Sequence, residues 1–141
     1  SADEVDDLFN KQSGLKGLTG ENDMRAVRHM VDSEDPEVAR RARLALDIYA
    51  TRIIKYIGSY TAELGGLDAI TFTAGIGEND ADLRREVCER LLPFGVRIDD
   101  EVNNQRFSAP TTISTEDSSI TVMVVPTNEE LAIARQALTL I

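Results

Sequence analysis

The chain is poor in the residues that build metal and covalent sites. Among its 141 residues there is one cysteine, Cys88, and one histidine, His29. A single cysteine forms no internal disulfide, which fits a reducing cytoplasm, and one His with one Cys excludes the common zinc arrangements. Cys88 falls on the apolar face of a helical pattern, so we expect a buried, inert thiol. His29 is interpreted as a surface or helix-end residue, and no motif supports a Ser-His-Asp triad.

Long apolar runs and an excess of basic charge are also absent. No run reaches the roughly 18 apolar residues that a membrane span needs, and the first residues lack the pattern of a secretory signal. Fifteen Lys and Arg against 25 Asp and Glu give a net charge of −10, which disfavours binding to nucleic acid or to an anionic membrane. A phosphate-bearing ligand therefore needs backbone donors, isolated arginines or a metal ion. Most of the carboxylates are expected to serve solubility.

What is present is 42% apolar residues, enough for the core of one ordinary domain, in an α/β pattern. The periodicity predicts helices over 3–12, 23–31, 35–64, 80–92 and from 127 onward, and strands over 70–73, 94–98 and 120–125. A loop is expected over 13–20 and irregular surface structure over 99–118. The three tyrosines of the long helix are interpreted as core or subunit-contact residues.

The last strand and helix carry clear local signals. Residues 120–125 are nearly all β-formers, which predicts a strand buried on both faces of a parallel sheet. Thr127 and Glu130 are spaced as a capping box. The helix that follows is expected to turn its apolar side chains inward, at Leu131, Ala134, Leu138 and Ile141. Two or three strands are few for a free-standing α/β domain, so further strands are expected outside this chain.

A strand, a glycine turn and a helix follow one another over residues 68–92, which is typical of a nucleotide site at the carboxyl edge of a sheet. Gly75 and Gly77 are expected to allow positive φ and to leave bare main chain, and Asn79 to cap the helix. The turn lacks the Lys-Ser or Lys-Thr of a P-loop. Acidic residues in the first helical turn favour the nucleoside end of a nucleotide. Asn79 and Glu129 are expected to face one cleft, where Glu129 either holds Mg²⁺ or compensates a helix dipole.

Four segments resemble the acetate kinase family. Residues 72–79 (FTAGIGEN) are similar to its nucleotide-site motif, and residues 10–20 (NKQSGLKGLTG) to a second hallmark. Residues 55–60 (KYIGSY) and 126–131 (PTNEEL) agree as well. These matches lie in the right order over nearly the whole chain. The resemblance identifies residues 1–141 as the C-terminal, nucleotide-binding part of an acetate kinase, an incomplete domain.

The resemblance implies a partial actin-like (ribonuclease H-like) ATPase fold, with a short, mainly parallel sheet flanked by helices. It also implies reversible phosphoryl transfer between ATP and acetate, giving acetyl phosphate and ADP. Met24 stands where the family often has Phe, and Ala74 where it commonly has Gly. Carried over position by position, the family's sites fall on Asp23, Met24 and Arg25 at the nucleotide, on Gly75, Ile76, Gly77 and Asn79 at the adenosine, and on Glu129 at Mg²⁺.

The same resemblance places the site for the short-chain carboxylate, and the groups that perform the transfer, outside this chain. No catalytic residue is therefore expected within it, and little or no turnover by the isolated piece. The intact enzyme is expected to be a cytoplasmic homodimer. Two alternatives stay open: a propionate kinase of the same family, and a non-catalytic nucleotide-binding or dimerisation module that uses the tyrosine-bearing helix as its interface.

Overall fold

The structure is a computed structural model that describes residues 1–139, apart from the side chains of Glu129 and Ala132. It consists of two units, Ser1–Tyr60 and the residues from Thr61 onward, each of which is considered by itself. Among the helices of residues 1–139, none is both long enough and apolar enough to cross a bilayer.

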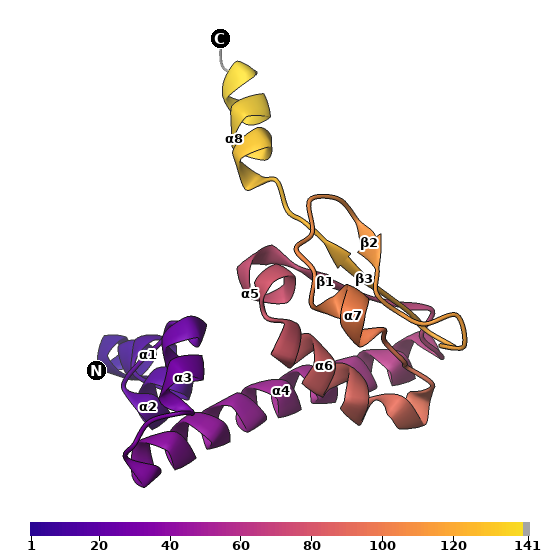
Figure 1. The fold of residues 1–141 in the computed structure, drawn as a ribbon. Coiled ribbons are helices and arrows are strands. Elements are labelled where there is room, and N and C mark those ends of the chain that lie inside the picture. Colours follow the sequence, from indigo (N-terminus) through magenta and orange to yellow (C-terminus); the bar gives the residue numbers. More distant parts are fainter. Residues whose placement is uncertain (140–141) are drawn as a thin grey trace. The chain divides into compact units, whose positions relative to one another are not determined.

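The first unit is helical (Figure 1). It contains α1 (Ala2–Lys11), α2 (Gly14–Thr19), α3 (Met24–Met30) and most of α4 (Pro36–Leu64). The predicted helices over 3–12, 23–31 and 35–64 are confirmed as α1, α3 and α4, but α2 lies where a loop was expected. The glycines of this segment were interpreted as breaks, whereas Gly20, at φ 83°, is the left-handed residue that ends a helical turn. Leu15 and Leu18, three residues apart, are half-buried on one side of it.

Helix α4 begins and ends at the predicted signals. Asp35 accepts hydrogen bonds at its Oδ1 from the main-chain N–H groups of the first turn, and Gly65 follows the helix at φ 71°. Its buried residues recur at three- and four-residue steps and are mostly small: Ala39, Ala42, Ala45, Leu46 and Ala50. Tyr56 and Tyr60 are 52% and 59% exposed, with ring centroids 6.2 Å apart. Of the two alternatives for these tyrosines, a place in the core is therefore wrong, and a place in a subunit contact stays a prediction.

The second unit contains a three-stranded sheet in the order β1-β3-β2. Strands β1 (Ala69–Thr73) and β3 (Thr121–Val125) are parallel and in register from Ala69 opposite Thr121 to Thr73 opposite Val125. The two-residue strand β2 (Thr111–Thr112) pairs antiparallel with β3, so the sheet is mixed. The inner face is buried at Ile70, Phe72, Val122 and Val124.

Strand β3 is the predicted one, but it is not buried on both faces. Val122 and Val124 are inaccessible, while Thr121 is exposed and Met123 and Val125 are half-buried. Continuous β-forming residues were interpreted as a sign of two covered faces. In this unit the alternation of burial shows that only one face of the strand is fully covered by the described residues.

Four further helices and a 3-10 turn complete the unit: α5 (Ala74–Asn79), α6 (Ala81–Arg90), η1 (Leu92–Phe94), α7 (Asp100–Asn103) and α8 (Glu129–Leu138). The turn η1 replaces the start of the strand expected over 94–98, of which only a bridge from Ile98 to Ser114 remains. Gly95 explains this, because its φ of 87° breaks an extended chain. Helix α7 and strand β2 lie in the region expected to be irregular.

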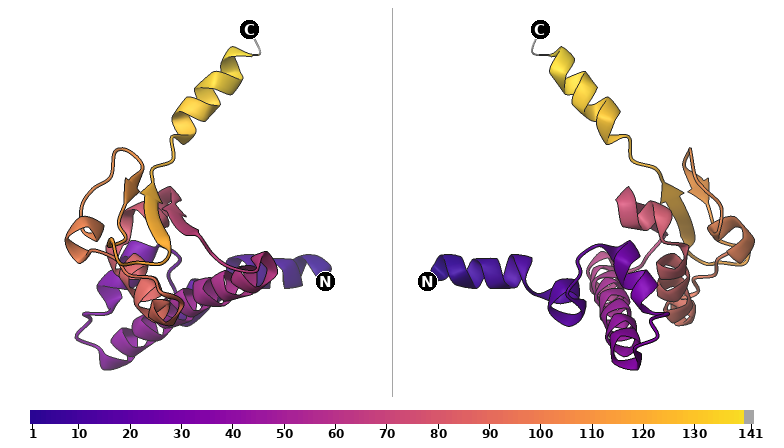
Figure 2. Two further views of the ribbon diagram at one scale, coloured as in Figure 1. Left: turned by 90° about the vertical axis from the view of Figure 1, so that its right-hand side faces the viewer. Right: turned by 60° about the vertical axis from the view of Figure 1, so that its left-hand side comes forward.

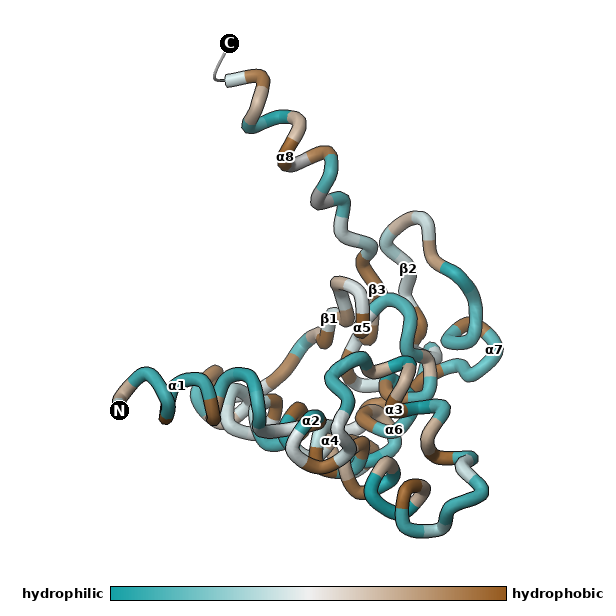
Figure 3. The backbone as a smooth tube through the Cα atoms, turned by 90° about the vertical axis from the view of Figure 1, so that its left-hand side faces the viewer, coloured by the Kyte–Doolittle hydropathy of each residue, from teal (hydrophilic) through white to brown (hydrophobic). Residues whose placement is uncertain are grey.

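Helix α8 follows β3 in the chain (Figure 2), and several of its apolar side chains are exposed. Leu131, Ile133 and Leu138 are 43%, 66% and 72% exposed, and Ala134 is exposed too. Hydrophobic and hydrophilic segments alternate along it (Figure 3). The expected inward orientation of Leu131, Ala134 and Leu138 is thus wrong for this chain, and Ile141 lies outside the described residues.

Candidate functional site

The carboxyl ends of β1 and β3 lie side by side because the two strands are parallel (Figure 1). The Thr73 hydroxyl donates a 2.8 Å hydrogen bond to the carbonyl of Val125, its register partner at this edge. The segments that follow the two strands, α5 after β1 and the turn before α8 after β3, therefore start from the same place. This is the edge at which the sequence predicts a nucleotide site.

The predicted glycine turn is a short helix. Residues 74–79 form α5, and the positive φ belongs to Ala74, at 58°, instead of Gly75 or Gly77. The two glycines differ in their surroundings. A Cβ at Gly77 would lie 3.2 Å from the carbonyl carbon of Phe72, whereas a Cβ at Gly75 would meet nothing within 4 Å. Gly77 thus lets the helix pack closely on its own strand, and Gly75 leaves bare main chain open to a ligand.

Asn79 ends α5, contrary to the prediction that it caps the next helix. Its Nδ2 donates a 2.8 Å hydrogen bond to the carbonyl of Gly75. The N-cap of α6 is Asp80, whose Oδ1 accepts from the main-chain N–H of Leu83 at 2.9 Å. Asn79 and Asp80 are adjacent, and both are residue types that commonly cap a helix, so the sequence left the start of α6 ambiguous by one position. Because Asn79 belongs to α5, the cap of α6 is Asp80. Ile76, in the middle of α5, is half-buried.

A hollow of about 360 Å³ opens at this edge of the sheet. Of the predicted adenosine residues only Gly75 lines it, whereas Ile76, Gly77 and Asn79 belong to α5 without lining it. The expected cleft thus forms at Gly75 instead of Asn79. The residues that line the hollow are Gly75, Glu78, Thr127, Asn128 and Glu130.

Glu78 and Asn128 line the hollow although the sequence analysis assigned them no role. One carboxylate oxygen of Glu78, Oε1, accepts 2.8 Å hydrogen bonds from both the main-chain N–H and the hydroxyl of Thr127. These bonds hold the pKa of Glu78 below its ordinary value, with the main-chain bond as the largest cause. The predicted capping box at Thr127 is therefore wrong, because the Thr127 hydroxyl donates its hydrogen bond to Glu78. Asn128 caps α8, accepting from the N–H of Leu131 at 2.9 Å. The available signal was an acidic residue directly after the glycine pair.

The donor set at the hollow suits a hard cation. Glu78, Asn128 and Glu130 bring oxygen ligands to its lining, and Mg²⁺ prefers oxygen and commonly uses one or two carboxylates with water and substrate phosphates. Among the side chains that the structure describes, which do not include that of Glu129, no three or more His, Cys, Asp or Glu form a metal-binding cluster. The residues fit a magnesium ion that the substrate helps to hold. Glu129 starts α8, but its side chain lies outside the described part of the structure.

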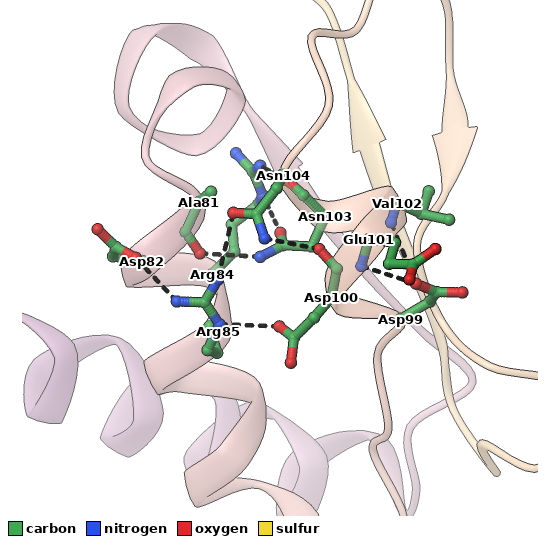
Figure 4. A network of polar contacts seen from close by, with 10 residues as sticks. All are labelled: Ala81, Asp82, Arg84, Arg85, Asp99, Asp100, Glu101, Val102, Asn103 and Asn104. Carbon is green, nitrogen blue, oxygen red and sulfur yellow. Dashed lines mark hydrogen bonds and ion pairs between the residues drawn. The ribbon is translucent and has the colours of Figure 1, made fainter.

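Arg84, on α6, donates hydrogen bonds to Asn103 of α7 (Figure 4) and to main-chain carbonyls of α5. Its side chain is 1% exposed. Nη1 donates to the carbonyls of Gly77 and Glu78, both at 2.9 Å, and the rest of the guanidinium donates to the side-chain and main-chain oxygens of Asn103 in α7. Burial lowers the pKa of Arg84, with the nearby Asp80 charge opposing that shift. The last carbonyls of α5, which have no partner within so short a helix, are thereby satisfied.

The other predicted nucleotide segment, residues 23–25, lies in the first unit. Asp23 caps α3 through the N–H of Arg25 and forms an ion pair with the Arg25 guanidinium at 2.8 Å. The hydrogen bonds from Arg25 lower the pKa of Asp23 to about 2. Met24 is 7% exposed, so its side chain belongs to the core, while the Arg25 side chain is 88% exposed.

Neither of the rare reactive residues takes part in the hollow. Cys88 is 1% exposed on α6, and burial raises the pKa of its thiol to about 12. Its thiolate population is negligible at neutral pH, which confirms the expected inert thiol. His29 is exposed in the last turn of α3, as the sequence indicates.

Comparison with known proteins supplies the family. The model of the acetokinase family matches residues 1–135. The chain belongs to this family. It is 56% identical over 136 residues to the acetate kinase of Leifsonia xyli, covering 96% of this chain and 33% of that protein. It is 52% identical over 134 residues to the acetate kinase of Oleidesulfovibrio alaskensis, covering 95% and 32%. This acetokinase chain thus spans about a third of the length of such relatives.

Solved structures agree on the fold. The acetokinase chain superposes on the Porphyromonas gingivalis acetate kinase with a TM-score of 0.84 at 37% identity, covering 99% of this chain and 34% of that one. For the Entamoeba histolytica acetate kinase the TM-score is 0.87 at 31% identity, covering 96% and 36%. The predicted fold class, an α/β part of an actin-like ATPase, is confirmed.

Replacing Arg84 with methionine is expected to lower the free energy of unfolding by about 3 kcal/mol, because four oxygens that the guanidinium serves lose their donors. The neighbouring Arg85→Met variant is the matched control. Arg85 pairs with Asp82 and Asp100 at the surface (Figure 4), and removing such pairs costs at most about 1 kcal/mol. Urea denaturation of both variants measures the difference, and equal losses would contradict the structural role of Arg84.

Replacing Ala74 with glycine is expected to stabilise the chain by about 1 kcal/mol, since the left-handed conformation is unfavourable for alanine and free for glycine. The same substitution at Ala109, a loop residue without positive φ, should instead cost about 0.5 kcal/mol through the unfolded state. The two variants are compared by thermal and urea denaturation. Destabilisation of the Ala74 variant would show that α5 does not start with a left-handed residue in solution.

Proposed function

We propose that this chain is the C-terminal, nucleotide-binding part of a cytoplasmic acetate kinase that transfers a phosphoryl group reversibly between ATP and acetate. It carries the adenosine side of the cleft as an incomplete domain. Because it spans about a third of its relatives, the acetate site and the groups at the transferred phosphate are assigned to the parts that it does not cover. The intact enzyme is proposed to be a homodimer.

The observation that carries this proposal is the open face of Gly75 in the hollow. A nucleoside can lie flat against main chain only where no side chain stands in the way. A Cβ placed at Gly75 would meet nothing within 4 Å, so the main chain is open there. Gly77 contributes by letting α5 sit on Phe72, and Asn79 by holding the Gly75 carbonyl. We assign the adenosine to this side of the hollow, with Ile76 as a half-buried apolar support.

The phosphate end requires charge compensation, because the chain has a net charge of −10 and the hollow is lined by Glu78 and Glu130. We assign Mg²⁺ to the start of α8, with Glu129 as its protein ligand. Glu129 would hold the ion there, and the ion would supply positive charge that compensates the negative charge of the phosphates during phosphoryl transfer. Within the first unit, Asp23 and Arg25 are proposed as nucleotide-binding residues because the family resemblance implies it, and the exposed Arg25 guanidinium could exchange its ion pair with Asp23 for a phosphate. Met24 would anchor this segment through its buried side chain.

Two other functions are kept because specific observations favour them. The chain is 40% identical to a propionate kinase of known structure from Francisella tularensis, with a TM-score of 0.80, covering 95% of this chain and 33% of that one. The acyl pocket that would separate acetate from propionate is assigned outside this chain. A non-catalytic dimerisation module is favoured by the exposed, stacked rings of Tyr56 and Tyr60.

Calorimetric titration of the chain with ADP in the presence of Mg²⁺ is expected to give saturable binding, and Gly75→Val to weaken it by at least about tenfold by filling the open face. Valine has a higher helix propensity than glycine, so α5 itself is not weakened. Gly75→Ala should give a smaller loss, and Ser108→Val, at an exposed loop residue outside the lining, none. No binding at millimolar ADP would favour the dimerisation module, and an unaffected Gly75→Val variant would move the site elsewhere.

The isolated chain is expected to form no acetyl phosphate from ATP and acetate, because positioning and neutralisation of the transferred phosphoryl group need residues that it does not contain. Trapping acetyl phosphate with hydroxylamine measures this directly. A control reaction with a full-length acetate kinase sets the detection limit. Turnover by the isolated chain would contradict the assignment of the transfer groups to the uncovered part.

A further inference from the structure

Glu78 joins two segments that are 49 residues apart in the sequence. It lies near the end of α5, four residues before Asp82 and three after Gly75. Its carboxylate reaches across the edge of the sheet and accepts both donors of Thr127, each at 2.8 Å. One side of the hollow, which carries Gly75, is thereby tied to the other side, where α8 begins.

The connection continues the sheet beyond its last pair of residues. At the edge itself the Thr73 hydroxyl bonds to the carbonyl of Val125. Pro126 comes next and has no N–H, so the N–H of Thr127 is the first main-chain donor after β3. It finds its acceptor in Glu78 instead of a strand neighbour. Because a charged acceptor strengthens both bonds, the turn after β3 is held more firmly than a neutral contact would hold it.

The position of Thr127 determines where α8 starts. Asn128, the next residue, caps α8 by accepting from Leu131, and Glu130 then lines the hollow. On the other side, α5 is fixed by Gly77 against Phe72 and by Arg84 at its last carbonyls. Glu78 is therefore the link between α5, which carries Gly75, and the start of α8, where Glu130 lines the hollow.

We infer that Glu78 is a positioning residue that couples the two ends of a bound nucleotide, by holding the start of α8 at a set place relative to α5. This inference rests on the proposed function and deepens it. Adenosine needs only the α5 side of the hollow. MgADP needs both sides at once, so its advantage over adenosine depends on the Glu78–Thr127 connection.

The test compares the affinities of adenosine and MgADP, by calorimetry, in the unaltered chain and in Glu78→Ala. Adenosine affinity is expected to stay within about twofold, while MgADP affinity falls by about tenfold. Glu78→Gln keeps an acceptor for the Thr127 N–H and should restore part of the loss. Glu116→Ala removes the same charge from an exposed loop outside the hollow and should change neither affinity.

Two further measurements examine the connection itself. Hydrogen exchange of the Thr127 amide is expected to accelerate in Glu78→Ala with no ligand present, because its acceptor is gone. Thr127→Val removes only the hydroxyl bond, so it should weaken MgADP less than Glu78→Ala does. Combined with Glu78→Ala, it should add almost nothing, as expected for two residues that act through one interaction.

Each other outcome overturns the inference in a recognisable way. If Glu78→Ala lowered the affinities for adenosine and MgADP equally, Glu78 would only support α5 in general. If the variant changed neither affinity, Glu78 would have no role in binding. If the unaltered chain bound MgADP no more tightly than adenosine, the proposed nucleoside site would be retained, but there would be no coupling between the two ends of the nucleotide. Failure of the unaltered chain to bind either ligand would overturn the proposed function together with the inference.

Discussion

The parallel pairing of β1 with β3 is the constraint on which the site depends. In a parallel pair both strands end at the same edge, so the residues that follow them are neighbours however far apart they are in the sequence. The pairing is stabilised by the buried face at Ile70, Phe72, Val122 and Val124, whose removal from water is its main driving force. An antiparallel pairing would place α5 and the start of α8 at opposite edges of the sheet, and the hollow would not exist.

A helix of six residues with two glycines is weak by itself, and the structure shows what holds it. Gly77 removes the side chain that would separate α5 from Phe72, and the buried guanidinium of Arg84 serves its last carbonyls. Burying a charge is unfavourable unless its hydrogen bonds are made, and all of those described for Arg84 end on oxygen. This rigid support lets Gly75 remain without a side chain, so open main chain and a fixed backbone are obtained together.

Acidic residues near the hollow have separate tasks. Asp80 caps α6, Glu78 connects α5 to Thr127, and Glu130, the next residue in the sequence after the proposed magnesium ligand Glu129, lines the hollow. These carboxylates repel a nucleotide polyphosphate unless a cation compensates its charge, whereas an uncharged nucleoside is not repelled. The division agrees with the assignment of adenosine to the glycine side and of metal to the start of α8.

The sequence by itself determined the features that depend on local signals: the long helix between Asp35 and Gly65, the strands at 70–73 and 120–125, the inert Cys88 and, through its motifs, the family. Where two local signals compete, it failed. The segment with Gly14 and Gly17 was predicted to be a loop but is helical. The predicted helix caps at Asn79 and Thr127 were each wrong by one residue, because the neighbouring Asp80 and Asn128 are the caps. Only the tertiary structure decided that Gly77 packs while Gly75 stays open, that Arg84 is buried, and that Glu78 bonds to Thr127. Each of these depends on a partner distant in the sequence, or on the space around a residue, and neither is encoded in local spacing.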